Sequence, residues 1–168
     1  QTAGIKICRQ ELVLTGGDTA IAVHPSDKRH TDLLGQRAQV PALDRQIPII
    51  TDSSVNPEFG SGAVKVTPGH DPNDYQIGLR HELEMLNILN PDGSLNENAG
   101  PFAKQDRLEA RANILRWLDE RALIEKVEDH EYAVGHGQRS GAIIEPMLSE
   151  QWFVRTKPLA AAAAAAVR

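Results

Sequence analysis

Short apolar runs, each ended by a turn-forming pair, recur along most of the chain. Two clear examples are residues 63–67, which end at Pro68-Gly69, and residues 19–23, which end at His24-Pro25. Runs rich in β-branched residues and bounded by Pro, Gly or Asp are typical of β-strands. The pattern predicts strands over residues 4–14, 19–23, 40–43, 47–50, 63–67, 82–89, 127–134, 142–144 and 152–154.

A helical spacing of apolar residues is clearest over residues 104–121, where charged residues fill the other positions. Asp71-Pro72 predicts a helix over residues 73–81, because Asp caps helices and Pro is tolerated at the first helical position. Ser26-Asp27 predicts a short helix that closes at Gly35, and the alanine-rich tail predicts a last helix. Many short strands and few helices, without regular βαβ alternation, predict an α+β fold with a β-barrel-like core.

Composition narrows the class of protein. The chain has 168 residues, 40% of them hydrophobic and 24% charged, as in a globular domain with a sizeable core. No apolar run approaches the ~20 residues of a membrane span, and no basic-then-apolar leader opens the chain. The single cysteine, Cys8, excludes an internal disulfide and a cysteine-built zinc site. We therefore predict a cytoplasmic protein.

The two ends and the net charge add two expectations. The chain starts at Gln1 without methionine and ends in an alanine run, which predicts a segment excised from something longer. The formal charge of -5 argues against generic binding to polyanions, while a local basic patch stays compatible with nucleic acid.

Polar residues gather where the strand predicted before Pro68-Gly69 ends. Lys65 and Thr67 point to one side, because alternate strand residues share a face, and His70, Asp71 and Asp74 follow the turn. A cation, a hydroxyl, an imidazole and two carboxylates at one strand end suit a site on a rigid scaffold. The alternative is that both aspartates only start a helix and that the lysine is solvated on an edge strand. The residues alone leave both interpretations open.

Other catalytic and cofactor motifs are absent from the sequence. It has no G-x-G-x-x-G or Walker loop, no G-x-S-x-G nucleophile elbow and no HExxH pair. His70 with Asp71 and Asp74 is the one local group that could ligate a metal, but strong sites usually supply three or four convergent ligands. We therefore expect neither a metal nor a cofactor. For Trp152 and Phe153 we predict packing in the core or against another domain.

Two motifs carry a resemblance to a known family. Gly62-Ala63-Val64-Lys65-Val66-Thr67-Pro68 and His70-Asp71-Pro72-Asn73-Asp74-Tyr75 closely resemble the signature of the editing domain of valyl-tRNA synthetases, the connective-peptide insertion of class I enzymes. Residues 17–25, 87–93 and 145–154 agree with that family in the same order. The resemblance covers nearly the whole chain and implies a β-barrel-like core of short strands decorated by helices.

The resemblance implies an activity, the hydrolytic post-transfer editing of Thr-tRNA(Val). A hydrophobic synthetic pocket barely rejects an isostere that only adds a hydroxyl, for which valine against threonine is the standard example, so a second site must sort by polarity. The implied partners are the 3′ acceptor end of tRNA(Val) carrying threonine and the rest of the synthetase chain, without a membrane. Residues 1–125 would form the editing core and residues 126–168 the return segment toward the synthetic core, and the isolated domain would be a monomer.

By resemblance, Lys65, Thr67, Asp71 and Asp74 form the catalytic set. Asp74 receives the α-ammonium group of the substrate, and Asp71 with Lys65 recognises its hydroxyl. Thr67 and the neighbouring backbone place the ester and a water molecule. The implied reaction has no covalent intermediate, and the identity of a general base stays open.

Four further residues form the implied substrate-binding set. Arg9 assists in recognising the substrate hydroxyl, and Phe59 lines the pocket. Glu11 and His70 complete the set at positions that match the motifs of the family.

The chain departs from the family near its N-terminus. Leu12 replaces a threonine of the usual Thr-Thr-Arg-Pro-Glu-Thr, and Thr15-Gly16 is an apparent insertion of two residues in the turn that follows. Both changes weaken the threonine-rich wall of the pocket, so we expect reduced activity or selectivity. Leu12 and Cys8 favour a second hypothesis, a module that binds the tRNA acceptor end after its hydrolysis has decayed. The intact catalytic set favours hydrolysis. A purely structural spacer within a synthetase is the third.

Overall fold

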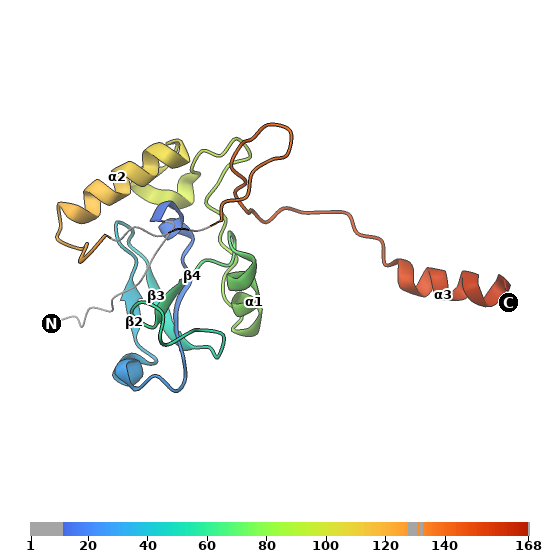
Figure 1. Ribbon diagram of the computed structural model, residues 1–168, viewed down its shortest axis with the longest axis horizontal. Helices are drawn as coiled ribbons and strands as arrows, with labels where there is room; N and C mark the ends of the chain where they lie inside the picture. Colours follow the sequence, from blue (N-terminus) through green and yellow to red (C-terminus); the bar gives the residue numbers. More distant parts are fainter. Residues whose placement is uncertain (1–11, 128–130, 132, 168) are drawn as a thin grey trace.

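Four short strands form one mixed sheet at the centre of the computed structural model, which describes residues 12–127, 131 and 133–167 (Figure 1). The strands are β1 (Ala20–Val23), β2 (Arg37–Gln39), β3 (Gln46–Thr51) and β4 (Ala63–Val66). The α-helices are α1 (Pro72–Arg80), α2 (Arg107–Asp119) and α3 (Thr156–Val167), and the 3-10 helices are η1 (Leu12–Gly17), η2 (Lys28–Leu33) and η3 (Glu97–Phe102).

The order of the strands across the sheet is β2-β3-β1-β4. The pair β1 and β3 is parallel, whereas β4 runs antiparallel to β1, and β2 runs antiparallel to β3. In the described part of the chain, β2 and β4 are therefore the edges of the sheet. The predicted α+β fold of short strands decorated by helices is confirmed.

The two faces of the sheet are buried against different partners. Ala20 and Ala22 pack with Val66 against Ile77 of α1 on one face. The opposite face carries a cluster that includes Ile21. Residues paired across an antiparallel ladder share a face, and Lys65 pairs with Ile21. The lysine therefore stands on the face opposite α1, at the end of β4.

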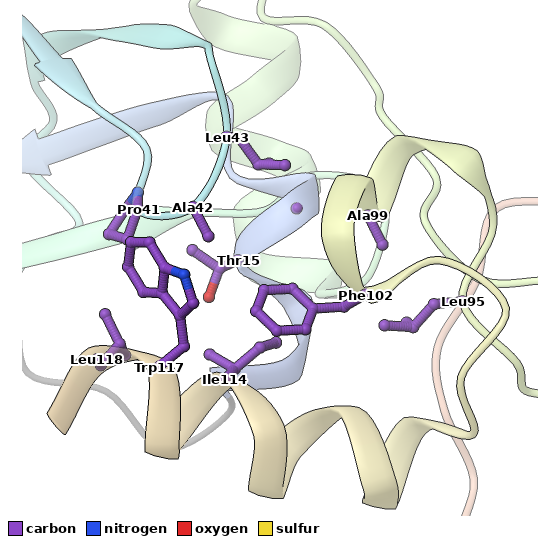
Figure 2. Close-up of a pocket in the computed structure, with 11 residues that line it drawn as sticks. Thr15, Pro41, Ala42, Leu43, Leu95, Ala99, Phe102, Ile114, Trp117 and Leu118 are labelled. Carbon is purple, nitrogen blue, oxygen red and sulfur yellow. The ribbon is translucent and has the colours of Figure 1, made fainter. Parts of the chain in front are cut away.

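A third core lies between α2, η1 and η3. Its apolar side chains leave a cavity of about 20 Å³, which Figure 2 shows between Trp117 and Phe102, with Thr15 pointing toward it. Gly16 also lines this cavity, so both residues of the apparent insertion, Thr15-Gly16, are buried against the core. The lining comes almost entirely from apolar residues, namely Pro41, Ala42, Leu43, Leu95, Ala99, Phe102, Ile114, Trp117 and Leu118.

Several predicted elements are confirmed with small shifts at their ends. The strands over residues 19–23, 47–50 and 63–67 correspond to β1, β3 and β4. The helix predicted over residues 73–81 is α1, and that over residues 104–121 is α2. The short helix after Asp27 is η2, and the alanine-rich tail forms α3.

The strand predicted over residues 40–43 is wrong. The strand in this region is β2, which ends at Gln39, and residues 41–44 form a turn. Pro41 has no N–H to donate to a ladder, and Ala42 has a φ of 63°, which no strand residue adopts. The apolar side chains here fill the cores next to the turn instead.

The strand predicted over residues 82–89 is also wrong. Glu82 has a φ of 52°, and the N–H of Leu83 donates to the carbonyl of Gly78 at 2.9 Å, which closes the end of α1. The segment continues as a loop that buries Ile88 and Leu89. Its alternation of polar and apolar residues therefore reflects a half-buried loop.

The strands predicted toward the C-terminus are absent from the described residues there, which contain one isolated bridge, between His136 and Ile143. Residues 12–14 belong to η1, and residues 4–11 lie outside the described part.

The C-terminal segment leads away from the sheet, and α3 lies apart from the other helices (Figure 1). Trp152 and Phe153 are 101% and 93% exposed, so the core alternative of their prediction is wrong, and packing against another domain stays a prediction. Among the described residues, no helix combines the length and apolarity needed to cross a membrane.

Replacing Leu118 with alanine should lower the free energy of unfolding by about 2–5 kcal/mol, because buried methyl groups are lost beside an existing cavity. Leu108 on the same helix is 58% exposed, so Leu108→Ala is the matched control and should change the value by less than about 0.5 kcal/mol. Urea unfolding followed by circular dichroism measures both. Equal losses would contradict the assignment of the buried face of α2.

Candidate functional site

The site is built where β4 ends and α1 begins. Asp71 has extended backbone angles, and its Oδ1 accepts from the N–H groups of Asn73 at 2.7 Å and Asp74 at 3.0 Å. Pro72 follows as the first helical residue, where no N–H is needed. The predicted cap is therefore confirmed, and it holds the first turn of α1 against the end of β4.

Asp74 turns back from this first turn toward the strand. Its Oδ2 accepts from the backbone N–H of Thr67 at 2.8 Å and lies 3.9 Å from Lys65 Nζ. The residue is 8% exposed. The strand end, the lysine and the helix start thus meet at one carboxylate.

Burial raises the pKa of Asp74 to about 6, because the charged form loses its hydration. The hydrogen bond from the Thr67 N–H and the charge of Lys65 oppose this rise, whereas the carboxylates of Asp71 and Asp18 add to it. Such a carboxylate is stabilised when a further cation approaches. The environment of Asp74 therefore suits the binding of a positively charged group.

Lys65 and Thr67 share a face, as their alternation predicts, and are joined directly. Lys65 Nζ donates a short hydrogen bond to Thr67 Oγ1. The Thr67 hydroxyl in turn donates to Asp18 Oδ1 at 2.7 Å. Sequence reasoning missed Asp18. The available signal was its place directly before the strand that pairs with β4.

His70 is buried and holds the fold around the site. Its Nε2 accepts from the backbone N–H of Ile88 at 2.9 Å, so the proton of the neutral ring is on Nδ1, which donates to the carbonyl of Pro146 at 2.9 Å. Both ring nitrogens are thus engaged by main-chain groups. His70 ties the loop after α1 and the return segment to the end of β4.

The remaining predicted residues are spread more widely. Phe59 is 49% exposed and lies in the loop before β4, at the end of that strand opposite Thr67. Arg9 and Glu11 lie outside the described residues. Among the described residues, no three His, Cys, Asp or Glu side chains converge as metal ligands. The structure therefore brings together Lys65, Thr67, Asp71 and Asp74, with His70 beside them.

The four residues predicted to be catalytic form a polar cluster in which Thr67 and Asp74 are buried and Lys65 and Asp71 are half-buried. The cavity of Figure 2 is lined by the α2 core, and a second depression of about 230 Å³ is lined by residues of β3 and by residues 82–84. Lys65, Thr67, Asp71 and Asp74 line neither of them.

A second buried carboxylate fixes the other end of α1. Asp52 accepts from Arg80 Nη2 at 2.9 Å, from His81 Nε2 at 2.9 Å and from the Ser54 hydroxyl at 2.6 Å. Burial alone would raise the pKa of Asp52, but these hydrogen bonds outweigh it and hold the pKa below its usual range. Sequence reasoning missed this cluster, whose contacts secure the helix that carries Asp74.

Comparison with known proteins identifies the class. The family model for the editing domain of leucyl-tRNA synthetase matches residues 18–131, which is more than half of the chain. The chain therefore belongs to this family of synthetase editing domains. The resemblance drawn from the motifs is confirmed.

The particular relatives are valine–tRNA ligases. That of Geobacillus stearothermophilus is 54% identical over 155 residues, that of Bacillus subtilis (strain 168) 51% over 159, and that of Staphylococcus carnosus (strain TM300) 49% over 156. The alignments cover 92%, 95% and 93% of this chain. They cover 17%, 18% and 18% of the relatives, so the chain spans under a fifth of their length.

The two buried aspartates predict opposite dependences of stability on pH. The native pKa of Asp74 lies above its unfolded value, so the native state binds the proton more tightly and stability falls as pH rises from about 4 to 6. Wild type should therefore lose roughly 2 kcal/mol relative to Asp74→Asn between pH 4.5 and pH 7. Urea unfolding at the two pH values measures this difference.

Asp52→Asn is the control for this experiment. The native pKa of Asp52 lies below its unfolded value, so its stabilising effect is complete above about pH 4 and is lost only as pH falls further. In a His81→Gln background, which removes the imidazole that contacts Asp52, the effect of Asp52→Asn should thus be the same at pH 4.5 and pH 7. If the difference in the free energy of unfolding between wild type and Asp74→Asn were also the same at pH 4.5 and pH 7, the raised pKa of Asp74 would be contradicted.

Proposed function

We propose that this chain is an aminoacyl-tRNA ester hydrolase that removes threonine from Thr-tRNA(Val). The observation that carries the proposal is the buried carboxylate of Asp74, which lies beside Lys65 where β4 meets α1. Membership of the editing-domain family and the names of the valine–tRNA ligase relatives support it. We also propose that the protein acts in the cytoplasm.

Asp74 binds the α-ammonium group of the aminoacyl ester in this proposal. A free amino acid ester carries one positive charge beside the scissile bond, and a buried carboxylate with a raised pKa is stabilised by that charge. The Thr67 N–H fixes the orientation of the carboxylate before the substrate arrives. The binding energy is therefore used to place the ester rather than to order the side chain.

Lys65 and Asp71 recognise the threonine hydroxyl. Valine has no hydroxyl, so its ester would leave these polar groups without partners, at a cost of about 1–3 kcal/mol for each group. This cost corresponds to a preference of about 5- to 150-fold for each such contact, because about 1.4 kcal/mol corresponds to a tenfold change in an equilibrium constant. The polar groups at the end of β4 are of the kind that such discrimination needs.

The reaction is the addition of water to the ester carbonyl. The oxygen of water bonds to the carbonyl carbon, the bond to the ribose oxygen breaks, and threonine and the free tRNA end are released. Because the aminoacyl ester is already activated, holding water and ester together supplies much of the acceleration. We assign no covalent intermediate and no general base.

The proposed partners are the 3′ acceptor end of tRNA(Val) and the remainder of a synthetase chain. Trp152 and Phe153 are almost fully exposed in the return segment, and Val154 is 68% exposed. Such an apolar run is suited to burial against a larger protein. Domain boundaries at residues 1–125 and 126–168 follow the same proposal, as does a monomeric isolated domain.

The direct test is deacylation of Thr-tRNA(Val) beside Val-tRNA(Val). Wild type should hydrolyse the threonyl ester only, and Asp74→Ala should slow this reaction by at least about 30-fold, because the substrate ammonium loses its buried partner. Asp119→Asn, which changes an exposed aspartate at the end of α2, is the control and should leave the rate unchanged. If neither ester were lost faster than its spontaneous rate, the proposal would be contradicted for this chain.

The second candidate function is a tRNA-end binding module whose hydrolysis has decayed. The replacement of a threonine by Leu12 favours it. The burial of Thr15-Gly16 against the α2 core does not favour it, since Lys65, Thr67 and Asp18 remain joined next to the apparent insertion. Leu12→Thr separates the two in the same assay: a large gain in hydrolysis supports decay, and an unchanged rate supports a working site.

A further inference from the structure

A series of hydrogen bonds between side chains connects Lys65 to the turn before β1. Its Nζ donates to Thr67 Oγ1, and the Thr67 hydroxyl donates to Asp18 Oδ1 at 2.7 Å. The direction follows from chemistry, because an ammonium group only donates and an ionised carboxylate only accepts. The hydroxyl of Thr67 therefore links the cation of Lys65 to the anion of Asp18.

The side chains at this hydrogen-bonded series differ in their exposure to solvent. Thr67 is 0% exposed and Asp18 is 4% exposed. The side chains of Lys65 and Asp74 are 14% and 12% exposed. An arriving substrate thus meets Lys65 and Asp74 first, while Asp18 and Thr67 support them from behind.

The turn that carries Asp18 is itself fixed. Arg45 Nη2 donates to the carbonyls of Gly16 at 2.6 Å and Asp18 at 2.9 Å. A Cβ atom on Gly17 would lie 2.9 Å from Thr67 Cγ2, so this turn needs glycine to approach the strand so closely. Asp18 therefore reaches Thr67 from a rigid support.

Lys65 and a substrate ammonium group compete for Asp74. Lys65 Nζ lies 3.9 Å from Asp74 Oδ2, longer than the roughly 2.7–2.9 Å of a charge-assisted hydrogen bond. The hydrogen bond to Thr67 keeps the lysine at this distance. Without that support, the lysine would move onto Asp74 and occupy the place of the substrate cation.

We propose that Asp18 is a positioning residue that acts through Thr67 to hold the Lys65 ammonium group away from Asp74, which leaves that carboxylate for a substrate ammonium group. The inference rests on the proposed function, since it assumes an aminoacyl ligand. The proposal also explains why a third carboxylate, that of Asp18, lies near Lys65 in addition to those of Asp71 and Asp74.

The test uses two non-hydrolysable amides of 3′-amino-3′-deoxyadenosine, one made with threonine and one with 3-hydroxybutyrate, which lacks only the α-ammonium group. Asp18→Ala should weaken binding of the threonyl amide about tenfold, because Lys65 then competes for Asp74. Binding of the hydroxybutyryl amide should weaken less than that of the threonyl amide, because it loses only the contact of its hydroxyl with Lys65 and no contact with Asp74. Asp18→Asn retains an acceptor for Thr67 and should restore most of the affinity.

The substitution Thr67→Val tests the same series of hydrogen bonds without altering the turn that carries Asp18. It should give the same selective loss as Asp18→Ala, and the double variant should be no worse than either single variant, because both changes break one linked chain. Equal weakening of both amides, no weakening of either, or additive losses in the double variant would overturn the role of Asp18.

A crystal structure of Asp18→Ala separates this inference from the proposed function. Lys65 Nζ should move to about 2.8 Å from Asp74 Oδ2. An unmoved lysine would overturn the inference, whatever the ligands do. A wild-type protein that binds neither amide would instead overturn the proposed function, and the position of Lys65 would still decide the role of Asp18.

Discussion

The hydrogen bond from the Thr67 N–H to Asp74 Oδ2 is the contact on which the rest of the site depends. It joins the last residues of a strand to the first turn of a helix across a single Pro-Gly turn. It also holds a carboxylate in a buried position where its pKa rises to about 6, because burial disfavours the charge. Lys65 lies close enough to share that charge but is engaged by Thr67. The carboxylate of Asp74 therefore lies beside a lysine that is itself hydrogen-bonded to Thr67.

The surrounding fold keeps this contact in place from several directions. The apolar face of the sheet packs on Ile77 of α1, and Asp52 holds the far end of that helix through Arg80 and His81. His70 fastens the loop after α1 and the return segment to the end of β4. Burial of the Asp74 carboxylate is unfavourable by itself, so these contacts offset the free-energy cost of burying it.

Local patterns predicted most of what surrounds the site. The alternation of Lys65 and Thr67 predicted that they share a face, and Asp71-Pro72 predicted the start of α1. Both features depend only on residues that are close in sequence. Asp18 lies 49 positions from Thr67, and only the pairing of β1 with β4 brings them together. The loop over residues 82–89 alternates like a strand because it is half buried, and a periodic pattern reports burial rather than hydrogen bonding. A tertiary contact of this kind cannot be predicted from any single stretch of sequence.

The central claim is that Asp74 is the acceptor for the ammonium group of an aminoacyl ester, and both family membership and the geometry around Asp74 support it. The most direct measurement is a carboxyl ¹³C NMR titration of Asp74, without ligand and with saturating threonyl amide of 3′-amino-3′-deoxyadenosine. The account predicts a pKa near 6 for the free protein. It predicts a pKa lower by about 1–3 in the complex, because an opposite charge within a few ångströms favours the carboxylate. A pKa of Asp74 that stays the same when the amide is bound would contradict the account.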